Sequence, residues 1–164
     1  MIYVKIYLKR DKSDENSRYI VYSESGDELY RINGKHTRSS HRMYIMSGDQ
    51  CVAKIRDTNL SMIRSCYVTT RDLSFHLTIT RSKGKFAVSY HGVTLHIRGD
   101  IINKSYDILD IDNTVLACVC RRYATSHDAL EININDEKFV LVSIATAVCF
   151  DSVCTTDAMT LQTT

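Results

Sequence analysis

A run of apolar residues near the C-terminus, Phe139–Phe150, limits the folds that are open to this chain. The run reads FVLVSIATAVCF, contains no charged residue and has only Ser143 and Thr146 as polar positions. A helix that is apolar on every face is buried on every face. Twelve helical residues rise about 18 Å, whereas bilayer hydrocarbon is roughly 30 Å thick. We therefore expect this segment to form a helix inside the protein and not to span a membrane.

The sequence before this segment is typical of short β-strands. About twelve runs rich in Val, Ile, Tyr, Thr and Phe alternate with turn signals such as Asn33-Gly34, Lys83-Gly84 and His91-Gly92. The stretch 57–64 is expected to be a longer loop or a helical turn. Regularly spaced strands with one all-apolar helix predict a mainly β fold, a closed antiparallel barrel of about twelve strands around a central C-terminal helix.

The domain boundaries follow from length and composition. A chain of 164 residues with no Pro and only six Gly offers no linker, so we expect one domain over residues 1–164. The barrel should occupy about residues 1–134 and the helix about 137–153, with a frayed tail after about 155. Asn135 and Asp136 are suited to cap the N-terminus of the helix.

No catalytic, cofactor or metal motif emerges from the sequence. The six cysteines form no C-x-x-C pair, the six histidines form no H-x-H or H-E-x-x-H pattern, and no P-loop, G-x-S-x-G or dinucleotide fingerprint is present. Asp107, Asp110 and Asp112 are explained by turn chemistry. The N-terminus lacks the apolar stretch of a signal peptide. We expect reduced thiols, a cytoplasmic location, no cofactor and no enzymatic activity.

Positive charge is concentrated in the middle of the chain. Residues Leu29–Gly99 contain twelve Lys or Arg and three Asp, whereas residues 100–164 contain four basic and ten acidic residues. A basic region attracts phosphates of lipid headgroups. The candidate anion-binding residues are Lys35, Arg38, Arg42, Lys83 and Lys85. The alternative is a solvated outer face whose charges pair with the acidic C-terminal half. Nucleic acid is not expected as a partner, because the net charge is only +2 and no recognition motif is present.

The order of these segments resembles the LURP-one-related family. Phe86–Asp110 matches the family's second half, which has a strand, a short turn, an apolar-x-G-[DN] motif and Y-x-I. The Val115–Arg121 strand and the apolar helix running into Asp151 follow in the same order. The first half matches at Tyr19–Tyr22, Gly26-Asp27, Leu29–Gly34 and Met43–Ile55. The resemblance covers about residues 1–155.

This resemblance implies a tubby-like fold, in which a closed barrel of about twelve antiparallel strands surrounds one hydrophobic helix. In the wider superfamily, tubby proteins bind phosphoinositides and phospholipid scramblases associate with membranes. The chain has no Trp, which relatives often place near strand ends, and no basic residue can be matched to tubby's phosphoinositide contacts. No site residue is therefore transferred.

These observations favour a non-enzymatic binding module that recognises an anionic headgroup, a phosphoinositide or phospholipid, or a protein partner, through its outer surface. Such a protein would be cytoplasmic and peripheral to the membrane. The alternatives are a carrier of a small apolar ligand and a scramblase-related membrane-associated protein. The expected central helix argues against the carrier, because it would fill the interior that a ligand needs.

Overall fold

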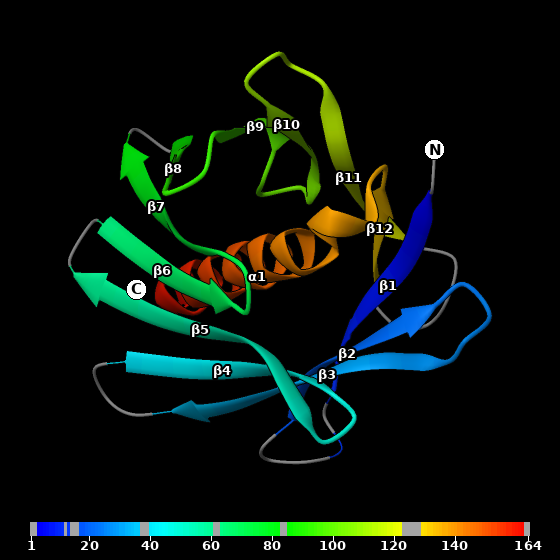
Figure 1. The fold of residues 1–164 in the computed structure, drawn as a ribbon. Helices are drawn as coiled ribbons and strands as arrows, with labels where there is room; N and C mark the ends of the chain where they lie inside the picture. The colour runs from blue at the N-terminus through cyan, green and yellow to red at the C-terminus, as the bar shows by residue number, and fades with distance from the viewer. Residues whose placement is uncertain are drawn as a thin grey trace.

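The computed structural model describes residues 3–11, 13, 17–36, 40–60, 63–82, 85–122 and 129–162. In Figure 1 a strongly curved sheet surrounds one helix, α1, drawn in orange to red. The twelve strands form one sheet in the order β8-β7-β6-β5-β4-β3-β2-β1-β12-β11-β10-β9, and every hydrogen-bonded pair of strands is antiparallel. The predicted fold class is confirmed.

Consecutive strands along the chain pair as hairpins, except β8 and β9, and the first strand also pairs with the last. The first six are β1 Val4–Arg10, β2 Ser17–Ser23, β3 Glu28–His36, β4 Ser40–Ser47, β5 Gln50–Leu60 and β6 Ile63–Thr70. The other six are β7 Ser74–Ser82, β8 Lys85–His91, β9 Leu95–Asp100, β10 Ser105–Asp110, β11 Val115–Arg122 and β12 Ala129–Ile134. The two ends of the hydrogen-bonded order, β8 and β9, lie near each other without pairing, so the barrel is nearly closed (Figure 1).

The expectation of a loop or helical turn over residues 57–64 is wrong. β5 continues to Leu60, β6 begins at Ile63, and the two strands stay in register from Ala53 opposite Thr70 to Leu60 opposite Ile63. The polar residues Asp57 and Arg64 gave the segment a loop-like composition. Their side chains pair with each other instead, the Arg64 Nε lying 3.0 Å from both Asp57 carboxylate oxygens.

The core lies between the inner face of the sheet and the helix. Inward positions alternate along each strand, as in β5, where Ala53 and Ile55 are buried while Lys54 and Arg56 are exposed. The helix residue Ile144 is fully buried, as expected for a segment without a polar face. The helix therefore packs against the inward side chains of the surrounding strands.

A short 3₁₀ turn, Glu137–Phe139, leads into α1, which spans Val140–Gln162. The Asp136 carboxylate accepts a hydrogen bond of 3.0 Å from the Lys138 backbone N–H, so Asp136 caps this turn as the sequence predicts. The helix continues past the predicted end near residue 153, where a frayed tail had been expected. No Pro or Gly follows Phe150 in the sequence to stop it.

One carboxylate fixes the helix at the end of its apolar run. Asp151 is buried and accepts hydrogen bonds from Arg10 of β1, at 2.9 Å, and from the Tyr19 hydroxyl of β2, at 2.8 Å. The Lys104 Nζ, from the turn between β9 and β10, lies 2.8 Å from the other carboxylate oxygen. Asp151 thus joins the helix to three separate parts of the barrel.

Candidate functional site

The outer face of β4–β8 contains no acidic side chain. These five strands hold a single acidic residue in sequence, Asp57. Its side chain is directed inward, buried beside Arg64, with a distance of 2.5 Å between the Arg64 Nη2 and an Asp57 carboxylate oxygen. Burial works against the charge of Arg64, but the hydrogen bonds that Arg64 donates to Asp57, and the charge of that carboxylate, outweigh it and raise the pKa of Arg64. This carboxylate is therefore not available to neutralise basic groups outside.

Exposed basic side chains lie on the same outer face. Arg42 on β4, Lys54 and Arg56 on β5, and Lys85 on β8 are exposed. Within the part of the chain that the structure describes, Arg42, Lys54 and Lys85 form no ion pair, and Arg56 contacts an aromatic ring instead of a carboxylate. Positive charge without a nearby carboxylate favours an anionic ligand.

The predicted anion-binding residues divide into three groups in the structure. Lys35 and Arg42 are opposite each other on β3 and β4, so their positions are brought together. Lys85 opens β8, and strands β5, β6 and β7 separate it from Arg42. Arg38 and Lys83 lie outside the described residues. Anion binding by these residues stays a prediction.

The strand register creates a row of side chains that the sequence analysis missed. Arg42 is opposite Arg56, and Arg56 is opposite Tyr67. Tyr67 is opposite His76, and His76 is opposite His91. We call Arg42, Arg56, Tyr67, His76 and His91 the outer row. It crosses β4, β5, β6, β7 and β8, so residues far apart in sequence become neighbours.

The aromatic members of the outer row are in contact. The Arg56 guanidinium lies 4.9 Å from the Tyr67 ring centroid, a cation–π geometry. The Tyr67 and His76 rings stack at 5.1 Å, and the His76 and His91 rings stack at 4.4 Å with only 15° between their planes. Tyr67 remains 39% exposed. The row is therefore an ordered surface feature that solvent can reach.

Hydroxyl side chains accompany the outer row on the same face. The neighbouring register positions across β5 to β8 are Thr58, Ser65, Thr78 and Ser89, each opposite the next. Ser89 is exposed and the other three are half-buried. Hydroxyl groups donate hydrogen bonds to oxyanions, so the chemistry beside the row is also suited to an anionic ligand.

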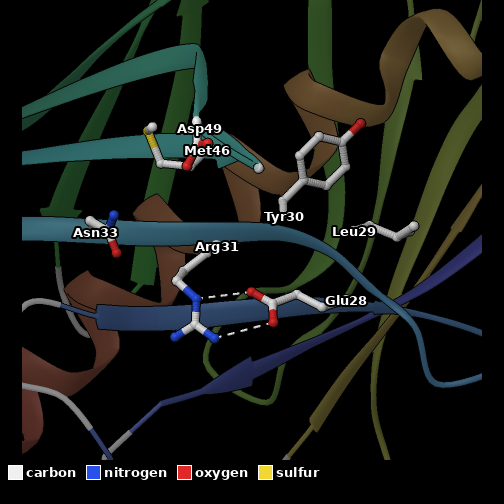
Figure 2. A pocket seen from close by; sticks show the side chains of 8 residues that line it. Glu28, Leu29, Tyr30, Arg31, Asn33, Met46 and Asp49 are labelled. Carbon is white, nitrogen blue, oxygen red and sulfur yellow. Dashed lines mark hydrogen bonds and ion pairs between the residues drawn. The ribbon is translucent and has the colours of Figure 1, made fainter.

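A surface hollow of about 430 Å³ lies beside the first half of β3 and the turn from β4 to β5 (Figure 2). Its lining residues are Glu28, Leu29, Tyr30, Arg31, Asn33, Met46, Gly48 and Asp49. Figure 2 shows Arg31 joined to Glu28 by two hydrogen bonds, of 2.9 and 3.2 Å. Asp11 lies 3.0 Å from the same guanidinium. Two carboxylates thus compensate the charge of Arg31, and the hollow is a weaker candidate for an anion.

The acidic hairpin of the C-terminal half has a structural role. The Asp110 carboxylate accepts hydrogen bonds from the backbone N–H groups of Asp112, at 2.8 Å, and Thr114, at 2.9 Å. Asp107 forms an ion pair of 3.0 Å with Arg98. Turn chemistry thus accounts for the Asp110 carboxylate, as the sequence predicts, whereas Asp107 is held by surface pairing. Among the described residues, no three His, Cys, Asp or Glu side chains gather as metal ligands would.

A nearly closed antiparallel barrel around one apolar helix defines a tubby-like protein. The model of the LURP-one-related family matches residues 4–151, and the chain belongs to this family. An X-ray structure of a protein from Arabidopsis thaliana is similar, with a TM-score of 0.57 and 13% sequence identity over 92% of this chain and 91% of the other. That likeness shows the fold alone. No curated protein matches the chain.

None of the helices in the described part of the chain combines the length and the hydropathy that crossing a bilayer requires.

Proposed function

We propose that this chain is a non-enzymatic binding module, peripheral to the membrane in the cytoplasm, that recognises the anionic headgroup of a phospholipid through the outer face of β4–β8. The observation that carries the proposal is that this face presents exposed basic side chains and no acidic one. The outer row and its neighbouring hydroxyl groups supply further donors. Tubby-like relatives that bind lipid headgroups make the same ligand class reasonable, but no residue is carried over from them.

The magnitude of the expected attraction follows from the number of basic groups. Each Lys or Arg near an anionic membrane surface contributes about 1 kcal/mol. Arg42, Lys54, Arg56 and Lys85 are exposed on this face, so their summed contribution is about 4 kcal/mol. That corresponds to a weak, salt-dependent association, which is appropriate for a reversible peripheral protein.

An interior ligand has less support than a surface ligand. The helix residues Ile144, Ala145, Ala147 and Val148 are fully buried in the barrel, and side chains of this kind fill the space that a carrier keeps open. The proposal is therefore restricted to the outer surface. A protein partner remains an outcome of the test described next.

Vesicle flotation tests the proposal directly. The untagged protein should float with vesicles of equal parts phosphatidylcholine and phosphatidylglycerol, and should not float with phosphatidylcholine alone. Arg42→Gln combined with Arg56→Gln should weaken binding roughly thirtyfold, since two charges near the surface are lost.

The matched control removes the same charge from the other half of the sheet. Arg98 on β9 and Arg122 on β11 form ion pairs with Asp107 and Glu131, at 3.0 and 3.1 Å. Arg98→Gln combined with Arg122→Gln should reduce binding much less. Equal losses in the two double variants would mean that net charge alone matters. If the protein bound no vesicles but captured a purified acidic protein, the ligand of this face would be a protein and not a lipid.

A further inference from the structure

Four members of the outer row form a continuous stack on the surface. Arg56 lies over the Tyr67 ring from the β5 side, and His76 stacks on that ring from the β7 side. His76 in turn lies between Tyr67 and His91, which come from the two strands that flank β7. Both faces of the Tyr67 and His76 rings are thus occupied by protein.

This arrangement restricts the chemistry of a ligand. Nucleobases bind to aromatic platforms by stacking on an open ring face, and the two central rings offer none. The polar groups of the stack follow one another along the row instead: the Arg56 guanidinium, the Tyr67 hydroxyl and the imidazoles of His76 and His91. A line of hydrogen-bond donors fits a ligand with several acceptor oxygens.

We infer that the stack of Arg56, Tyr67, His76 and His91 binds an oxyanion, either the phosphate of a lipid headgroup or a free anion, and that the imidazole pair takes up protons when the anion binds. This inference rests on the proposed function for the location of the ligand, and adds the residues that contact it and the pH dependence of the contact.

The proton linkage follows from the spacing of the two rings. Imidazoles exchange their protons between about pH 5 and pH 8. With centroids 4.4 Å apart, two imidazolium charges repel each other, and Arg56 at the end of the stack adds a third positive charge. An anion over the ring edges offsets this repulsion, so it favours the doubly protonated pair. Linkage is reciprocal, so protonation must also favour the anion.

Among the described residues, no carboxylate forms an ion pair with His76 or His91. β6 presents Tyr67 to the pair, and the link from β8 to β9, residues 92–94, is uncharged. The turn from β6 to β7 carries Arg71 and Asp72, both exposed and opposite in charge. On the next outward positions Lys54 of β5 adds only positive charge. An external anion is therefore the expected counter-charge.

The experiment measures binding of the untagged protein to phosphatidylcholine–phosphatidylglycerol vesicles between about pH 7.5 and about pH 5.5, where the lipid phosphodiester keeps its charge. As pH falls, affinity should rise by about tenfold per pH unit for each proton taken up on binding. His76→Gln and His91→Gln should each remove most of this rise. His96→Gln should retain it, because His96 lies on β9 and bonds Asn113 at 2.8 Å.

A second arm uses inorganic sulfate, whose charge is also constant, and follows the His76 and His91 ring resonances by NMR. If sulfate shifted these resonances more strongly at low pH but vesicles did not bind, the ligand would be a free anion. That result would contradict the lipid as ligand and would leave oxyanion binding by the stack supported. Vesicle binding with the same affinity at all pH values, or with the same pH dependence in both histidine variants, would overturn the inference and leave the proposed function standing. If a variant fails to fold, the resonances of the unmodified protein carry the test.

Discussion

Replacing Asp151 by Ala should be among the most destabilising single changes in this protein. The carboxylate is held by Arg10, Tyr19 and Lys104, with polar distances between 2.8 and 2.9 Å. Tyr19 is buried and the Lys104 side chain is only 16% exposed. Removing the carboxylate therefore takes a hydrogen-bond acceptor from the Tyr19 hydroxyl and a counter-charge from Lys104, and water can replace neither fully. Loss of one partner of a buried ion pair costs about 3–5 kcal/mol. In a chain of this size that lowers Tm by about 6–20 °C.

The same carboxylate should make stability depend on pH. Burial opposes its charge, but the hydrogen bond from Lys104 and the charge of Arg10 prevail and lower the pKa of Asp151. A carboxylate with a lowered folded-state pKa stabilises the protein fully above its unfolded value of about 3.9. That contribution is lost as pH falls through the lower folded value. The difference in unfolding free energy between the wild type and Asp151→Asn should therefore shrink below about pH 4.

Urea unfolding followed by circular dichroism measures both effects. Asp107→Asn is the matched control, because its ion pair with Arg98 has a similar distance, 3.0 Å, but side chains that are 29% and 60% exposed. An exposed pair contributes only about 0–1 kcal/mol. If Asp151→Asn and Asp107→Asn lowered stability equally, burial would not decide the value of these pairs. A pH-independent difference for Asp151→Asn would contradict the lowered pKa.

Three further predictions concern the core and the thiols. Ala145→Asp should prevent folding, because Ala145 is fully buried. The cost of burying an unpaired charge there exceeds a domain's stability of about 5–15 kcal/mol. A soluble variant that unfolds cooperatively would show that the helix is not central. In alkylation with peptide mapping, exposed Cys51 should react first, while Cys66 and Cys149, both buried, should be protected until unfolding. Burial and the Asp107 hydrogen bond raise the pKa of Cys118 to about 11, so its alkylation should still accelerate above about pH 9; a plateau near neutral pH would contradict this.

The fold could be predicted from the sequence because its strongest signals are local. An uncharged apolar run requires burial, and alternating strands with short turns supply a wall around it. The prediction for the polar segment 57–64 is wrong because composition does not reveal that the side chains of Asp57 and Arg64 pair across a hairpin. This pairing arises only in the folded chain. It allows two charged side chains in a loop-like sequence to occupy inward positions on neighbouring strands.

The outer row illustrates how far register can be inferred. The turn signal at Lys83-Gly84 is centred so that residues 76 and 91 come opposite each other, and His76 and His91 could have been paired from it. Arg56 and Tyr67 could not, because their register depends on a turn inside the mispredicted segment. A single basic residue such as Arg42 is visible in the sequence, whereas the stack beside it exists only through the strand register.

The most direct test of the account is an NMR map of the surface that contacts an anionic lipid. Monomeric short-chain phosphatidylglycerol added to labelled protein should shift backbone amides along β4–β8, with the largest changes near Arg56, Tyr67 and His76. Short-chain phosphatidylcholine should leave them unchanged. Shifts confined to β9–β12, or identical responses to the two lipids, would contradict the claim that the outer face of β4–β8 recognises an anionic group.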